Sequence, residues 1–72
     1  MREIARLEAL AEAAYTAMYD APRHAARDFH DDAQGYLSRA VKIADLKSKT
    51  EISTRLKQRK KHIYDVYSHQ FR

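Results

Sequence analysis

Apolar residues recur at spacings of three and four along three stretches of the chain, which is the periodicity of one face of an α-helix. In the first stretch the members of this stripe are Ile4, Leu7, Ala11, Ala14 and Met18, with Leu10 and Ala17 beside them. Because alanine is small, this stripe would let a neighbouring helix approach closely. The pattern predicts a first helix over about residues 2–19.

The second and third stretches repeat the pattern. The second runs from about residue 22 to 46, and its stripe is Ala26, Phe29, Ala33, Tyr36, Leu37, Ala40, Val41 and Ala44, with Ile43 alongside. Gly35 falls inside this helix at a cost of about 1 kcal/mol relative to alanine, and we attribute it to close packing against the first helix. The third helix is predicted over about residues 49–71, with its inward residues being Ile52, Leu56, Ile63, Val66, Tyr67 and Phe71.

Two short breaks separate these stretches. Pro22 lacks a backbone N–H and disfavours helical geometry in the residue before it, so it ends the first helix and suits the first turn of the second. The second break is Lys47–Thr50. There Ser48 and Glu51 have the spacing of a capping box, which predicts Ser48 as the N-cap of the third helix.

The expected fold is therefore all-α, a small antiparallel up-down-up three-helix bundle in a single domain covering residues 1–72. One glycine and one proline in 72 residues leave too few turn residues for an all-β fold. The alternative is a long two-helix hairpin in which the first two helices are continuous and kinked at Pro22.

The length of the chain limits its stability. A domain of this size buries only about 60% of the surface that its unfolded chain exposes, and alanine supplies much of its apolar content. The chain has no cysteine, so disulfides cannot compensate for the small core. We therefore expect the bundle to be completed by self-association or by a protein partner.

Several functional classes are not predicted. The chain has no long apolar run and no signal-peptide pattern at its first residues, so we expect a soluble cytoplasmic protein without membrane contact. No catalytic motif or glycine-rich phosphate loop occurs, and a bundle this small offers little room for a pocket. An enzyme is not expected, and neither is a cofactor or a small-molecule substrate.

Positive charge gathers in the third predicted helix. Residues 1–46 carry six basic and eight acidic side chains, whereas residues 47–72 carry eight basic and two acidic. A helix rich in cations could bind nucleic acid or an acidic protein. The alternative is a solvent-exposed helix face whose positive charge balances the negative charge of the first half of the chain. The candidate binding residues are Arg55, Lys57, Arg59, Lys60, Lys61 and Tyr64.

Two histidine–aspartate triplets have helical spacing. Each aligns nitrogen and oxygen ligands on one helix face, as zinc, iron or nickel sites require. Both triplets lie largely off the apolar stripes, which favours solvent over a metal ion as their surroundings. The weak candidates are His24, Asp28 and Asp31 on the second helix, and His62, Asp65 and His69 on the third.

Tyrosines form two pairs at helical spacing. Tyr15 and Tyr19 belong to the first helix, and Tyr64 and Tyr67 to the third. The first and third helices are parallel in an up-down-up bundle, so both pairs should lie at one end. Such residues suit either the edge of a core or a contact surface.

These observations favour a non-enzymatic helical module for protein–protein interaction or assembly. The alternative is a nucleic-acid-associated accessory protein that uses the basic third helix.

Overall fold

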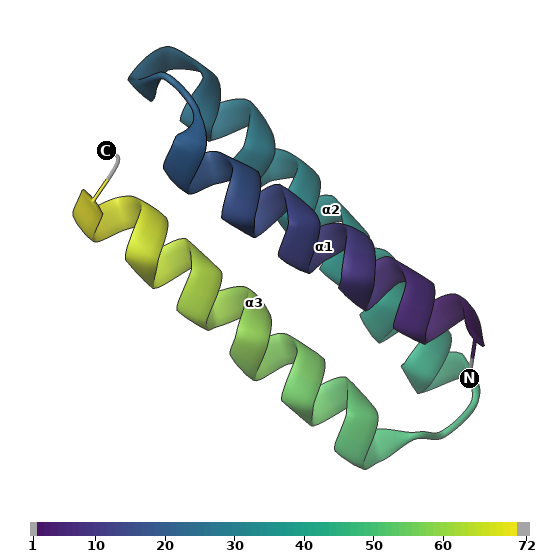
Figure 1. The fold of residues 1–72 in the computed structure, drawn as a ribbon. Coiled ribbons are helices and arrows are strands. Elements are labelled where there is room, and N and C mark those ends of the chain that lie inside the picture. Colours follow the sequence, from purple (N-terminus) through teal and green to yellow (C-terminus); the bar gives the residue numbers. More distant parts are fainter. Residues whose placement is uncertain (1, 71–72) are drawn as a thin grey trace.

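The computed structural model describes residues 2–70, which form three helices and no strand. Helix α1 covers Arg2–Asp20, α2 covers Arg23–Leu46 and α3 covers Thr50–Gln70. The chain reverses direction at each short connection, which gives the up-down-up order of a three-helix bundle (Figure 1). The predicted fold class is confirmed, and each described helix end lies within one residue of its prediction. Phe71, predicted to face inward, lies outside the described residues.

Buried positions in the helices follow one spacing rule. Along α1 and α2 the buried residues alternate at intervals of three and four, as in coiled-coil packing. The buried residues of α1 are Ile4, Leu7, Ala11, Ala14 and Met18, and those of α2 are Ala26, His30, Ala33, Leu37, Ala40 and Ala44. Alanine makes up half of the buried apolar residues, so α1 and α2 lie close together.

Helix α3 is the most polar of the three. Its buried residues are Ser53, Leu56 and Ile63, and the half-buried Lys60 and Tyr67 continue the same three-four spacing. The fully buried large side chains are Met18 on α1, Leu37 on α2, and Leu56 and Ile63 on α3. The core therefore depends on few large residues.

The bundle is flattened. Its Cα atoms extend over 38 × 20 × 12 Å. Helix α2 packs closely against both α1 and α3, whereas the backbones of α1 and α3 stay farther apart (Figure 1). Long side chains consequently span the distance between α1 and α3.

The first connection excludes a single kinked helix. Pro22 occupies the N-cap of α2 with φ −57° and ψ 150°, outside helical geometry. Its carbonyl oxygen accepts hydrogen bonds from the backbone N–H groups of Ala25 and Ala26, at 2.8 and 3.1 Å. Proline therefore starts α2 as the cap, one position earlier than a first-turn proline, and its missing N–H leaves no unsatisfied donor there.

The second connection differs from the predicted capping box. Helix α3 begins at Thr50, so Lys49 and not Ser48 precedes it, and Ser48 adopts φ 56°. The Ser48 N–H donates to the Asp45 carbonyl at 3.1 Å, and the Lys49 N–H donates to the Ala44 carbonyl at 2.8 Å. These two hydrogen bonds form a Schellman motif, in which glycine is the usual residue at the left-handed position.

Ser48→Gly should therefore stabilise the protein. A non-glycine residue in the left-handed region costs about 1–2 kcal/mol, part of which is offset by the greater freedom of glycine in the unfolded chain. We expect a net gain of about 1 kcal/mol in the free energy of unfolding, measured by urea denaturation. Lys47→Gly is the control, because φ at Lys47 is −99° and glycine gains nothing there. Equal or lower stability of Ser48→Gly would contradict the assignment.

Gly35 does not serve helix packing, contrary to the prediction. It is exposed on α2, and a Cβ built there meets no neighbouring atom within 4 Å. Glycine in a helix carries an entropy penalty, and no steric constraint at this position requires a glycine.

Gly35→Ala should raise the free energy of unfolding by about 1 kcal/mol, the difference in helix propensity between the two residues. Thermal and urea denaturation would measure the gain. Ser38→Ala on the same helix is the control, because Ser38 is also exposed and its propensity difference from alanine is smaller. A loss of stability in Gly35→Ala would show that the glycine has a packing role.

Candidate functional site

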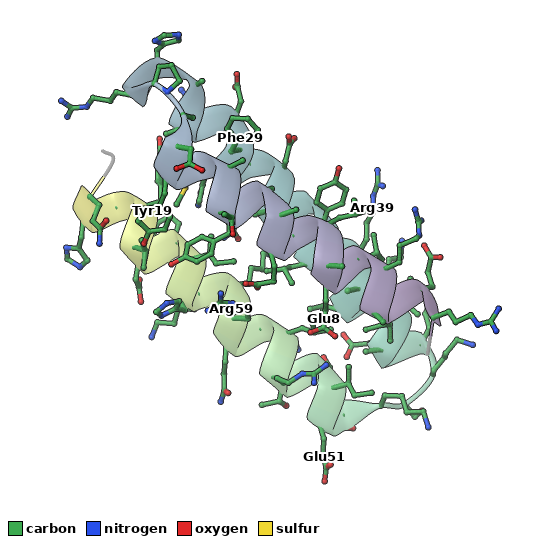
Figure 2. The ribbon with its side chains drawn as sticks, in the orientation of Figure 1. Glu8, Tyr19, Phe29, Arg39, Glu51 and Arg59 are labelled. Carbon is green, nitrogen blue, oxygen red and sulfur yellow. The ribbon has the colours of Figure 1, made fainter. Side chains whose placement is uncertain are left out.

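Two ion pairs connect α1 to α3. The Arg55 guanidinium donates to a carboxylate oxygen of Glu8 at 2.7 Å. Arg59 donates from Nε to Oε2 of Glu12 at 2.7 Å and from Nη2 to the other oxygen, so that this pair is bidentate. Both pairs join residues 47 apart in sequence, which shows that the parallel helices α1 and α3 are in register. Figure 2 shows Glu8 and Arg59 on the facing sides of these helices.

Tyr15 extends the same contact toward the C-terminal end of α1. The guanidinium carbon of Arg59 lies 5.0 Å from the centroid of its ring, within cation–π range. His62 meets Tyr15 edge to face at 6.4 Å between centroids. The Tyr15 and Tyr19 hydroxyls are 3.2 Å apart. Burial, together with the hydrogen bond to Tyr19, raises the pKa of Tyr15.

The predicted basic patch on α3 is divided by these contacts. Arg55 and Arg59 form ion pairs with Glu8 and Glu12 on α1. Lys57, Lys61 and Tyr64 are exposed, and their spacing places them on a different side of α3. Lys60 is half-buried, and its carbonyl oxygen accepts a 2.9 Å hydrogen bond from the Gln34 side chain. The six predicted residues therefore do not form one cationic surface.

A groove of about 460 Å³ lies between α2 and α3. This volume falls within the range of ligand sites, contrary to the expectation that so small a bundle has little room for a pocket. Two aromatic rings and several polar groups line it from both helices. The lining residues are Arg27, His30, Asp31, Tyr64, Tyr67 and Ser68.

His30 is the central residue of this groove. It is 7% exposed, and its ring stacks on Tyr67 at 4.1 Å between centroids and an interplanar angle of 15°. Its Nδ1 lies 3.5 Å from a carboxylate oxygen of Asp31. Its Nε2 and the Ser68 hydroxyl oxygen are both buried and have no hydrogen-bond partner in the described part of the chain. Buried polar atoms without a hydrogen-bond partner are rare in folded proteins, and their presence calls for a functional or structural explanation.

Sequence reasoning missed His30. The second stripe was assigned Phe29, which is only half-buried, whereas His30 takes the buried position. The signal was present, because Ala26, His30, Ala33 and Leu37 continue the alternation of four and three. A histidine in an apolar stripe was overlooked because histidine is usually exposed or intermediate in burial.

The two tyrosine pairs have different surroundings. Tyr15 and Tyr19 lie on the α3-facing side of α1, while Tyr64 and Tyr67 approach His30 on α2, at 6.0 and 4.1 Å between centroids. Tyr19 and Tyr64 are about half exposed, whereas Tyr15 and Tyr67 are half-buried. Among the described residues, the two pairs therefore have different neighbours, and each pair has one ring that is more exposed than the other.

Neither histidine–aspartate triplet forms a three-ligand cluster. Within residues 2–70, no group of three or more His, Cys, Asp or Glu side chains is placed to hold a metal ion. His62 turns toward Tyr15 on α1 and is thereby separated from the α2 triplet, while Asp31 lies beside His30. The geometry brings together neither His24, Asp28 and Asp31 nor His62, Asp65 and His69.

Comparison with known proteins gives no match to a family model, to a curated protein or to a solved structure. None of the three described helices has the length and apolar character that crossing a membrane requires. The functional argument therefore depends on the surfaces of the bundle itself.

The Glu12–Arg59 pair should make stability depend on pH. The hydrogen bond that the Glu12 carboxylate accepts from Arg59 lowers the pKa of Glu12 below the ordinary value of 4.5. The pair therefore stabilises the fold above that pH, and this contribution is lost as the pH falls through the lower pKa of the folded state. In urea denaturation, Glu12→Gln should flatten the decline in stability below about pH 4.5.

A double-mutant cycle with Glu12→Gln and Arg59→Gln should give a coupling energy of about 0.5–1 kcal/mol at neutral pH, because both side chains are partly exposed and screened. The cycle of Glu3→Gln and Arg6→Gln, an exposed pair within α1, is the control and should show a smaller coupling. Zero coupling between Glu12 and Arg59 would contradict a role for this pair in joining α1 to α3.

Proposed function

We propose that this protein is a non-enzymatic helical assembly module that associates with a second copy of itself through the outer side of the α1–α2 contact. The observation that carries the proposal is that four large apolar side chains are only half-buried along this contact, against six that are buried in the core. The six in the core are Ile4, Leu7, Met18, Leu37, Leu56 and Ile63, and the four along the contact are Leu10, Phe29, Tyr36 and Ile43.

Helical spacing gathers these residues on one side of the bundle. Phe29, Tyr36 and Ile43 are seven residues apart and share one side of α2, and the hydroxyl of Tyr36 is near Arg6 on α1. Leu10 lies on the side of α1 opposite the α3-facing Glu8. We call this surface the seam face, and it consists of Leu10, Ala13, Ala17, Phe29, Tyr36 and Ile43. Figure 2 shows Phe29 on the part of α2 away from α3.

The composition of the seam face suits an interface. Its six members carry no charge, and charged side chains such as the Glu3–Arg6 pair and Arg39 border it. An apolar centre with a polar rim is the usual anatomy of protein interfaces. Ala13 is exposed and small, so a partner helix could approach α1 closely there.

Energetics supports association of two copies. The small alanine-rich core leaves the monomer with little hydrophobic stabilisation, and further burial of the half-buried apolar groups in a dimer would add to it. A standard interface buries roughly 800 Å² on each partner, which is about one-sixth of the 5003 Å² surface of this chain. A two-fold dimer would present the seam face to itself.

Part of the surface that would bind nucleic acid in the alternative function is exposed to solvent. Lys57, Lys61 and Tyr64 are exposed and share a side of α3, but Arg55 and Arg59 form ion pairs with α1. Fewer free cations mean fewer phosphate contacts, so this observation favours the assembly function.

Analytical ultracentrifugation of the full chain should show a mass that rises with concentration from monomer to dimer. Ala13→Glu should weaken dimerisation at least tenfold, because it places an unpaired charge in an apolar interface (about 1.4 kcal/mol or more). Gln58→Glu is the matched control on the exposed side of α3 and should leave the mass unchanged.

Circular dichroism should show that both variants keep the helical content of the wild type, since both positions are exposed. A monomer mass at every concentration, or an equal effect of Gln58→Glu, would overturn the proposal. Salt-dependent binding to single-stranded polynucleotide by a monomer would favour the nucleic-acid alternative in its place.

A further inference from the structure

We propose that the groove between α2 and α3 is a binding site for a small aryl carboxylate. The groove has a volume of about 460 Å³ and lies on a different side of α2 from the seam face. Three polar side chains with hydrogen-bonding capacity still available and one half-exposed aromatic ring converge on it, namely Arg27, His30, Ser68 and Tyr64.

The first argument is the unsatisfied polar atoms. His30 and Ser68 line the same groove from different helices, and Nε2 of His30 and Oγ of Ser68 are buried without a hydrogen-bond partner in residues 2–70. A buried polar atom left unpaired is destabilising relative to the same atom in water. A ligand that bonds to both atoms would remove this penalty, so the groove favours a ligand with at least two polar contact points.

The second argument is the balance of charge. Arg27 is exposed and forms no ion pair within the described chain, while Asp31 lies 3.5 Å from Nδ1 of His30. The carboxylate of Asp31 is thereby associated with the imidazole, and the guanidinium of Arg27 is the charge left for a ligand. A carboxylate suits it because guanidinium groups bind carboxylates through two parallel hydrogen bonds. A dianion such as phosphate would be repelled more strongly by Asp31.

Proton placement follows from the same geometry. A carboxylate only accepts hydrogen bonds, so Nε2 of His30 must carry a proton to contact it. The ring with its proton on Nε2 supplies this donor. The other charged or titratable groups lining the groove are Arg27 and Asp31 on α2 and Tyr64 and Tyr67 on α3.

The aromatic part of the ligand is inferred from Tyr64. Its ring is 48% exposed at the groove, next to the stacked pair of His30 and Tyr67. A flat ring could cover this apolar surface, and offset or edge-on contact of aromatic rings adds to the stabilisation from burial. Benzoate combines such a ring with a carboxylate and fits within the volume of the groove.

The test is an NMR titration of the full chain with benzoate, observing the side-chain resonances of His30 and the amide of Ser68. We expect saturable shifts of both. Arg27→Gln should weaken binding about tenfold or more, since it removes a charge-assisted contact. Arg39→Gln, the control on the same helix away from the groove, should bind like the wild type.

Benzamide has the same shape without the charge and should bind at least tenfold more weakly than benzoate. Three results would each overturn the proposal: no saturable shift, equal affinity for benzamide, or unchanged affinity in Arg27→Gln. Repeating the titration with Ala13→Glu separates this site from self-association. Binding by that variant supports the groove whatever its oligomeric state, and loss of binding in it assigns the shifts to the seam face and overturns the groove.

Discussion

Close packing of α1 against α2 is the contact on which the rest of the bundle depends. Buried alanines on both helices, among them Ala11, Ala14, Ala33 and Ala40, leave room for the two backbones to approach. This packing uses the apolar stripe of α1 and much of that of α2. Helix α3 therefore packs mainly on the remaining side of α2, and the bundle becomes flat instead of triangular.

The flat shape of the bundle explains why ion pairs connect α1 to α3. At this separation short side chains do not meet, but arginine and glutamate are long enough to span the distance. The pairs Glu8–Arg55 and Glu12–Arg59, each 47 residues apart, fix the register of the two parallel helices more specifically than apolar contacts would. The same pairs neutralise much of the charge imbalance between the two halves of the sequence.

The helices and their ends followed from the sequence because a spacing of three and four is a local property. Contacts between helices did not follow, because they depend on which faces meet. The helical spacing of α3 already places Arg55 and Arg59 on a different side from Lys57 and Lys61. What the register of α1 with α3 adds is the pairing of these two arginines with glutamates of α1. The capping prediction at Ser48 failed for a related reason, because the end of α2 extends into the connection and fixes Ser48 at positive φ.

Polar residues at buried positions link the fold to its proposed activities. His30 and Ser53 occupy places in the three-four spacing where leucine or isoleucine would stabilise the bundle more. An unpaired buried polar group costs about 1–3 kcal/mol, a large fraction of the 5–15 kcal/mol stability that is typical of a whole domain. Ser53 does not line the groove between α2 and α3. His30 does, and its neighbours Arg27 and Ser68 supply the other contacts that a ligand needs. A sequence selected for stability alone would fill this position with an apolar residue, so the polar groove favours binding over packing as the reason for His30.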